Sequence, residues 1–140
     1  MKTRILAVCV LALPLFLGMG VAQSDNQLRV PEPDRNFTAT VTDQEDVTTT
    51  VEKFSCEGQT YFMGRRGKTQ LSVEFSKIAS ARFLISTTGV TADFTMKDGD
   101  VLSLAMNPDE ACYGVSRYGN VRIRMKDIKT LEALGVKAVP

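Results

Sequence analysis

From Phe37 onward, apolar residues recur at every second position, and this period constrains the fold more than any other feature of the chain. They alternate with Thr across residues 37–42, with polar residues across 70–75 and with basic residues across 121–126. This alternation is typical of strands that bury one face and expose the other. Asp98-Gly99 adds a strong hairpin signal. The pattern predicts an all-β fold, a small β-sandwich or partly open β-barrel of about seven to nine short strands.

The strand pattern also occurs twice along the chain. When Ile78 is aligned with Ile128, the alternating residues that precede them coincide. With small gaps upstream, the alignment pairs further residues, namely Tyr61 with Tyr113 and Gly67 with Gly119. This internal repeat predicts that the domain is built from two similar β units, 38–84 and 93–134.

The end of the second unit is ambiguous. Residues 128–134 have helical spacing, with Asp127 before them and Gly135 after them, which favours a short helix. The matching segment of the first unit, 78–84, has the pattern of a strand. We expect a strand in both units, and a short helix at 128–134 stays open.

Residues 1–22 are organised like a secretory signal peptide. Lys2 and Arg4 precede an apolar run, and Gly20-Val21-Ala22 supplies the small residues of a cleavage site. The run is shorter than the ~20 apolar residues of a transmembrane helix. We therefore expect a periplasmic or secreted bacterial protein with no transmembrane segment in the mature chain.

The rest of the chain contains one predicted domain. Residues 23–36 are polar, include Pro31 and Pro33, and predict a disordered or extended lead-in. Residues 37–140 form the single β domain. Cleavage also removes Cys9 and leaves two cysteines, Cys56 and Cys112, which in an exported chain predict one disulfide bond.

Composition excludes several functions. The chain has no His, which excludes Ser-His-Asp and Cys-His catalysis and imidazole metal ligands. Its 17 basic and 16 acidic residues give a net charge of +1, which provides no reason to expect nucleic-acid binding. We predict no catalytic residue, no metal ligand and no cofactor.

Two groups of basic residues are candidates for binding an anion. They are Arg65, Arg66 and Lys68 in a glycine-containing loop, and Arg122 and Arg124, with Lys126, on the polar face of one expected strand. Arg side chains and exposed amides suit phosphate, sulfate or carboxylate groups. The simpler interpretations are a solvated turn and a charged strand that resists edge-to-edge pairing.

Acidic and aromatic residues have weaker patterns. Carboxylates gather in two expected turns, 43–46 and 98–100. We expect them to bind the turn backbone, and calcium binding stays open because the spacing differs from an EF-hand. Four aromatic residues are candidates for stacking on a sugar, although we expect core positions for most of them: Tyr61, Phe62, Tyr113 and Tyr118.

The second unit contains a hairpin at Lys97-Asp98-Gly99, then Tyr118-Gly119-Asn120-Val121-Arg122-Ile123, and then Asp127-Ile128-Lys129-Thr130-Leu131. This succession resembles a small β-repeat of exported bacterial proteins. The first unit departs from it, with Gln44-Glu45 in place of Asp-Gly and Arg66-Gly67 in place of Tyr-Gly. The resemblance implies an exported β fold and no particular activity.

These observations predict a non-catalytic, exported bacterial envelope domain that binds a partner protein or an anionic envelope component, such as a lipid headgroup or a polymer. Two alternatives from other classes stay open. One is a structural accessory subunit that is held in an assembly through exposed strand edges. The other is a hydrolase that uses paired carboxylates without histidine.

Overall fold

The computed structural model describes residues 27–136, and the predicted signal peptide lies outside them. The strands are β1 (Phe37–Asp43), β2 (Thr48–Cys56), β3 (Tyr61–Arg66), β4 (Thr69–Glu74), β5 (Ile78–Ser86), β6 (Gly89–Met96), β7 (Val101–Met106), β8 (Ala111–Ser116), β9 (Gly119–Arg124) and β10 (Ile128–Val136). Two short 3₁₀ helices, η1 (Phe75–Lys77) and η2 (Met125–Asp127), precede β5 and β10. No helix in the described range is long and apolar enough to cross a membrane.

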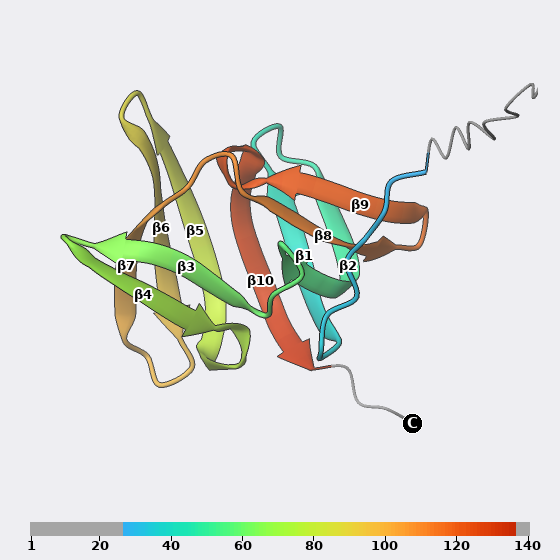
Figure 1. The fold of residues 1–140 in the computed structure, drawn as a ribbon, viewed down its shortest axis with the longest axis horizontal. Helices are drawn as coiled ribbons and strands as arrows, with labels where there is room; N and C mark the ends of the chain where they lie inside the picture. The colour runs from blue at the N-terminus through green and yellow to red at the C-terminus, as the bar shows by residue number, and fades with distance from the viewer. Residues whose placement is uncertain (1–26, 137–140) are drawn as a thin grey trace, which may run out of the picture.

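All ten strands belong to one curled antiparallel sheet, in the order β4-β3-β7-β6-β5-β10-β1-β2-β8-β9 (Figure 1). The all-β prediction is confirmed. The strand number is slightly above the expected seven to nine, because most hairpin turns are only two to four residues long and leave the flanking residues free to pair. Of the two predicted architectures, the partly open barrel describes this single curled sheet.

The sheet has two halves that meet where β5 pairs with β10. We call β3 to β7 the inserted half, because these strands are contiguous in the chain. We call β1, β2, β8, β9 and β10 the terminal half. Figure 1 shows the two halves on either side of the β5–β10 junction. Each predicted unit therefore contributes strands to both halves rather than forming one half by itself.

The halves contain corresponding elements. The run β3-β4-η1-β5 has 6, 6, 3 and 9 residues, and so does β8-β9-η2-β10. In each half, an acidic turn is bonded to the last residue of a 3₁₀ helix. The backbone N–H of Gln44 donates to the carbonyl oxygen of Asp127, and that of Lys97 donates to the carbonyl oxygen of Lys77, both at 2.9 Å. These runs correspond without gaps, so that Gly64 matches Gly114.

The gaps that paired Tyr61 with Tyr113 and Gly67 with Gly119 were therefore wrong in this region. They followed residue identity, whereas close packing sets the strand register. A Cβ atom at Gly64 would lie 2.8 Å from Cβ of Leu104. At Gly114 it would collide with Val51 of β2. Each glycine thus lets its strand lie close against a neighbour.

Phenylalanines form the centre of a single core that extends through both halves. Phe75 lies 5.5 Å from Phe37 and 5.5 Å from Phe54 in the terminal half, measured between ring centroids. It also lies 4.8 Å from Phe62 in the inserted half. Their contacts tie the halves together by burial of apolar surface as well as by strand pairing.

β10 is a strand, as expected, despite its helical spacing. Its buried residues Ile128, Leu131 and Leu134 are three positions apart rather than two. The pairing with β1 contains two register shifts, each with an extra residue on β10. Such bulges change which face the following side chains occupy, and this accounts for a helix-like pattern in a strand.

The described part of the lead-in, 27–36, has no regular secondary structure but lies against the terminal half. The Asn120 amide donates a hydrogen bond to the Leu28 carbonyl at 2.7 Å. Lys53 N–H donates to Oδ1 of Asn36 at 2.7 Å, and Lys53 forms an exposed ion pair with Glu32. These contacts hold the segment as an extended strap across β2 and the start of β9.

Candidate functional site

The structure separates the two predicted groups of basic residues. The loop expected to hold Arg65, Arg66 and Lys68 was wrong in part, because Arg65 and Arg66 pair with β4 as the end of β3 and only Lys68 lies in the turn. Arg122 and Arg124 lie on β9, at the opposite end of the strand order (Figure 1). The five residues therefore do not form one convergent anion site. Each group has to be judged by its own surroundings.

Arg122 and Arg124 are exposed on β9, and neither forms an ion pair with another described residue. The residues between them face the other way, so that Val121 and Ile123 are half-buried against the core. β9 thus has a basic face and an apolar face.

β9 is also one of the two free edges of the sheet, and among the described strands it pairs with β8 alone. Ser116 and Gly119 flank the two-residue turn and form the first hydrogen-bonded pair of the hairpin. Along an antiparallel ladder, hydrogen-bonded pairs alternate with pairs that share no hydrogen bond, and Arg122 and Arg124 belong to the second kind. This alternation directs the backbone N–H and C=O groups of Arg122 and Arg124 away from β8. The other free edge, β4, has the sequence TQLSVE and contains no basic residue.

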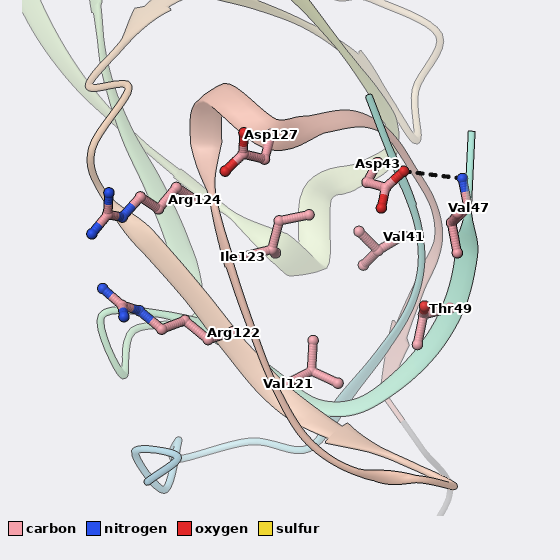
Figure 2. Close-up of a pocket in the computed structure, with 9 residues that line it drawn as sticks. All are labelled: Val41, Asp43, Val47, Thr49, Val121, Arg122, Ile123, Arg124 and Asp127. Carbon is pink, nitrogen blue, oxygen red and sulfur yellow. Dashed lines mark hydrogen bonds between the residues drawn. The ribbon is translucent and has the colours of Figure 1, made fainter. Parts of the chain in front are cut away.

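An open cleft of about 440 Å³ lies on the apolar side of β9. Figure 2 shows Val121 and Ile123 pointing into it, toward Val41 on β1. Arg122 and Arg124 also border the cleft, but in the same view their side chains point away from it, on the opposite side of β9. Two strand faces of different chemistry therefore meet at one free backbone edge.

The cleft exists because Val41 and Thr49, which line it, are smaller than the residues at the corresponding positions of the inserted half. The β1–β2 and β6–β7 hairpins correspond, with Val41 opposite Thr49 in one and Phe94 opposite Leu102 in the other. Phe94 is fully buried, and Leu102 packs against the core of the inserted half. Smaller side chains at the corresponding positions leave the terminal half open beside β9.

Two carboxylates line the same cleft, Asp43 and Asp127. Oδ1 of Asp43 accepts hydrogen bonds from the N–H groups of Glu45 at 2.9 Å and Val47 at 3.0 Å (Figure 2 shows the second). Asp98 accepts the N–H of Asp100 at 2.9 Å in the corresponding hairpin. Both acidic turns thus use a carboxylate to bind their own backbone.

A metal site at these turns has no further support. Within 27–136, no group of three or more Cys, Asp or Glu side chains is arranged to hold a metal ion. Calcium binding by the acidic turns stays an open prediction.

Glu110, which no sequence pattern singles out, lines a second cleft of about 470 Å³ together with Arg65 and Gln70. Burial raises the pKa of its carboxyl above the ordinary value, and the nearby Glu57 carboxylate raises it further. Oε1 of Glu57 accepts the N–H of Ala111 at 2.9 Å. No sequence pattern indicates this pair, because 53 positions separate the two glutamates and the β2–β8 pairing brings them together.

The four aromatic candidates lie in different environments. Phe62 is fully buried, while Tyr61 and Tyr113 are half-buried. Tyr118 is 83% exposed at the tip of the β8–β9 hairpin, with the Arg117 guanidinium 4.9 Å from its ring centre. The four side chains therefore do not form one stacking surface.

Cys56 and Cys112 lie directly opposite each other on β2 and β8, and both are buried. Their sulfur atoms are 2.12 Å apart, at disulfide-bonding distance. The two cysteines belong to different predicted units but to the same half of the sheet. The whole inserted half lies between them in the chain.

Comparison with known proteins places this chain in a family. A family model described as "Uncharacterised protein" matches residues 33–135. The chain belongs to that family. The match contains β1 to β9 in full and β10 except for its last residue, and it includes both free edges. Neither the curated proteins nor the solved structures contain a match.

Proposed function

We propose that this chain is an exported, non-catalytic envelope domain that recognises an anionic partner along β9. The observation that supports this most strongly is the Arg122–Arg124 pair, which is exposed and forms no ion pair with any residue in 27–136. Unpaired guanidinium groups bind carboxylate, phosphate or sulfate without first breaking an internal ion pair. The partner is a protein or an anionic polymer of the envelope.

The β9 site is favoured over Arg65, Arg66 and Lys68 because a free edge adds backbone donors to the charge. Strand edges commonly carry basic residues to prevent unwanted pairing, and this is the main competing explanation. The two explanations differ in outcome. A binding role predicts lost affinity on removal of the arginines, whereas a guarding role predicts self-association.

The test uses the mature chain from Gln23 and three probes, which are vesicles containing anionic phospholipid, a sulfated glycan and an acidic peptide. We expect binding to at least one probe to weaken steeply with salt, because exposed charges are screened over ~8–10 Å. Arg122→Gln/Arg124→Gln should reduce that binding by about tenfold or more. The melting temperature should stay nearly unchanged, since exposed substitutions usually cost less than ~0.5 kcal/mol.

Arg65→Gln/Arg66→Gln is the matched control, since it removes the same charge at the opposite end of the sheet. It should leave the affinity nearly unchanged. An equal loss in both variants would mean that net charge rather than β9 governs binding, and absence of salt-sensitive binding to every probe would reject the proposal. Self-association of the β9 variant with unchanged binding would favour the guarding role.

Export is the second part of the proposal. It is supported by Lys2 and Arg4 before an apolar run, by the small residues at 20–22, and by a buried cysteine pair at disulfide distance. Mass analysis of the exported protein should show that it begins at Gln23. A chain that keeps Lys2 and Arg4 would contradict cleavage.

The accessory-subunit alternative draws on the two free edges β4 and β9. It predicts capture of a constant partner that is insensitive to salt and to the arginine substitutions. The same binding experiments therefore distinguish it from the main proposal.

A further inference from the structure

We infer that the partner is a protein segment that pairs with β9 as an additional antiparallel strand, and that acidic and aliphatic side chains alternate along it. This inference rests on the proposed function, and it specifies the chemical class of the partner at the same site.

Within the described range, the backbone of β9 has unpaired groups along its outer edge. The N–H and C=O groups of Arg122 and Arg124 point outward from the last strand, and no described residue pairs with them. An extended peptide satisfies such groups by continuing the ladder. The strap meets β9 at its start, where the Asn120 amide bonds to Leu28, and no residue in 27–136 pairs with the outer edge of the stretch from Val121 to Arg124.

The side chains of β9 alternate between the basic face and the apolar face. Residues opposite each other in neighbouring strands share a face of the sheet. A residue opposite Arg122 or Arg124 therefore lies on the basic face, where a carboxylate is favoured. The residues next to it in the added strand lie on the face of Val121 and Ile123, beside the cleft.

The cleft beside β9 favours apolar side chains. Its apolar surface comes from valine and isoleucine side chains, and its volume of about 440 Å³ accommodates aliphatic side chains. Arg122 and Arg124 border the same cleft with their side chains pointing away from it (Figure 2). Asp43 and Asp127, in contrast, line it and would repel an acidic side chain there. The added strand is therefore expected to have acidic residues opposite Arg122 and Arg124, on the basic face, and apolar residues at the positions between them, on the cleft side.

The probe is a peptide in which Glu and Val alternate. Its length is about seven residues, which is within the usual length of one strand. A peptide of the same composition with Glu and Val in separate blocks is its control. We expect the alternating peptide to bind about tenfold more tightly than the block peptide. Equal affinities would overturn the inference while leaving the proposed function in place, provided that both peptides lose affinity with Arg122→Gln/Arg124→Gln.

Backbone methylation tests strand pairing without changing the protein. In the antiparallel ladder, the peptide residues opposite Arg122 and Arg124 are the Glu residues, and their N–H groups face β9. Methylation of the Glu nitrogens should abolish binding. Methylation of the Val nitrogens should be tolerated, because those groups face solvent. Equal effects of the two modifications would overturn the inference.

Thr49→Leu tests the cleft by introducing the residue found at the corresponding position of the inserted half. It should weaken binding of the alternating peptide and leave binding of an all-Glu peptide unchanged. Thr50→Leu, which places the same side chain on the exposed opposite face of β2, is the matched control. Equal effects of the two leucines would overturn the cleft assignment. If the wild-type protein bound neither peptides nor polyanions in a way that depends on Arg122 and Arg124, the proposed function would itself be rejected.

Discussion

At the scale of single residues, the tightest constraint lies where β8 passes β2. Gly114 faces Val51 with no space for a side-chain carbon, and the Glu52 carbonyl oxygen would lie 2.7 Å from that carbon. The glycine is needed for close approach and not for a special backbone angle. Gly64 has the same function beside β7 in the other half.

Gly114→Ala should therefore destabilise the protein by about 1–3 kcal/mol, which is typical of overpacking in a core. Urea unfolding of the mature chain measures this loss. Combining it with Val51→Ala should cost less than the sum of the two single changes, because truncation removes the colliding methyl group. Wild-type stability in Gly114→Ala would show that the strands can separate freely.

Glu110 makes stability depend on pH. Burial and the Glu57 carboxylate raise its pKa in the folded state, so folding favours the protonated form. Stability is therefore lost as the pH rises from the unfolded-state pKa through the raised folded-state pKa. Glu110→Gln should raise the melting temperature at about pH 7 and have little effect below about pH 4.

Glu57→Gln should reduce the same pH dependence, since it removes the neighbouring charge but keeps an oxygen for the Ala111 N–H. Melting curves across the pH range test both variants. An increase in melting temperature for Glu110→Gln that is the same at acidic and neutral pH would contradict this assignment.

At the scale of elements, the cysteine pair joins β2 to β8 at the point where the chain leaves the terminal half and returns to it. The two cysteines are 56 positions apart, and the inserted half fills the interval. By the chain-entropy model, a bond across such a loop stabilises the fold by ~4 kcal/mol. Its location predicts that it mainly secures the terminal half.

Cys56→Ser/Cys112→Ser should lower the melting temperature markedly and leave the β-sheet circular dichroism spectrum in place. Hydrogen exchange through local opening, short of global unfolding, should accelerate more in β2 and β8 than in β5 and β6, which pair elsewhere in the sheet. Thiol titration of the unfolded, unreduced mature protein provides the direct measurement. Two free thiols per chain would contradict the bond.

At the scale of the whole molecule, the halves share one core and one junction. β10 lies between β5 and β1, and Leu131 on it is fully buried opposite Ala81 of β5. The Phe75 contacts cross the same boundary. We therefore expect both halves to unfold together in a single transition.

Leu131→Ala should destabilise the protein by about 2–5 kcal/mol and accelerate hydrogen exchange in both halves alike. Val136→Ala is the control, because Val136 lies on the same strand and is 50% exposed. It should cost less than ~0.5 kcal/mol. Two separate unfolding transitions in Leu131→Ala would show that the halves are independent.

The sequence by itself determined the β class and the two acidic hairpin turns, because both depend on alternation and turn residues within a few positions. It also identified the cysteine pair, because only two cysteines follow the predicted cleavage site. The tertiary structure decided that Arg65 and Arg122 lie at opposite ends of one sheet, since strand order depends on non-local pairing. It also decided that Val41 and Thr49 border a cleft, whereas Phe94 and Leu102 fill the corresponding space in the other half. Whether a side chain fills a space depends on which side chains pack against it, and only the tertiary structure determines those neighbours.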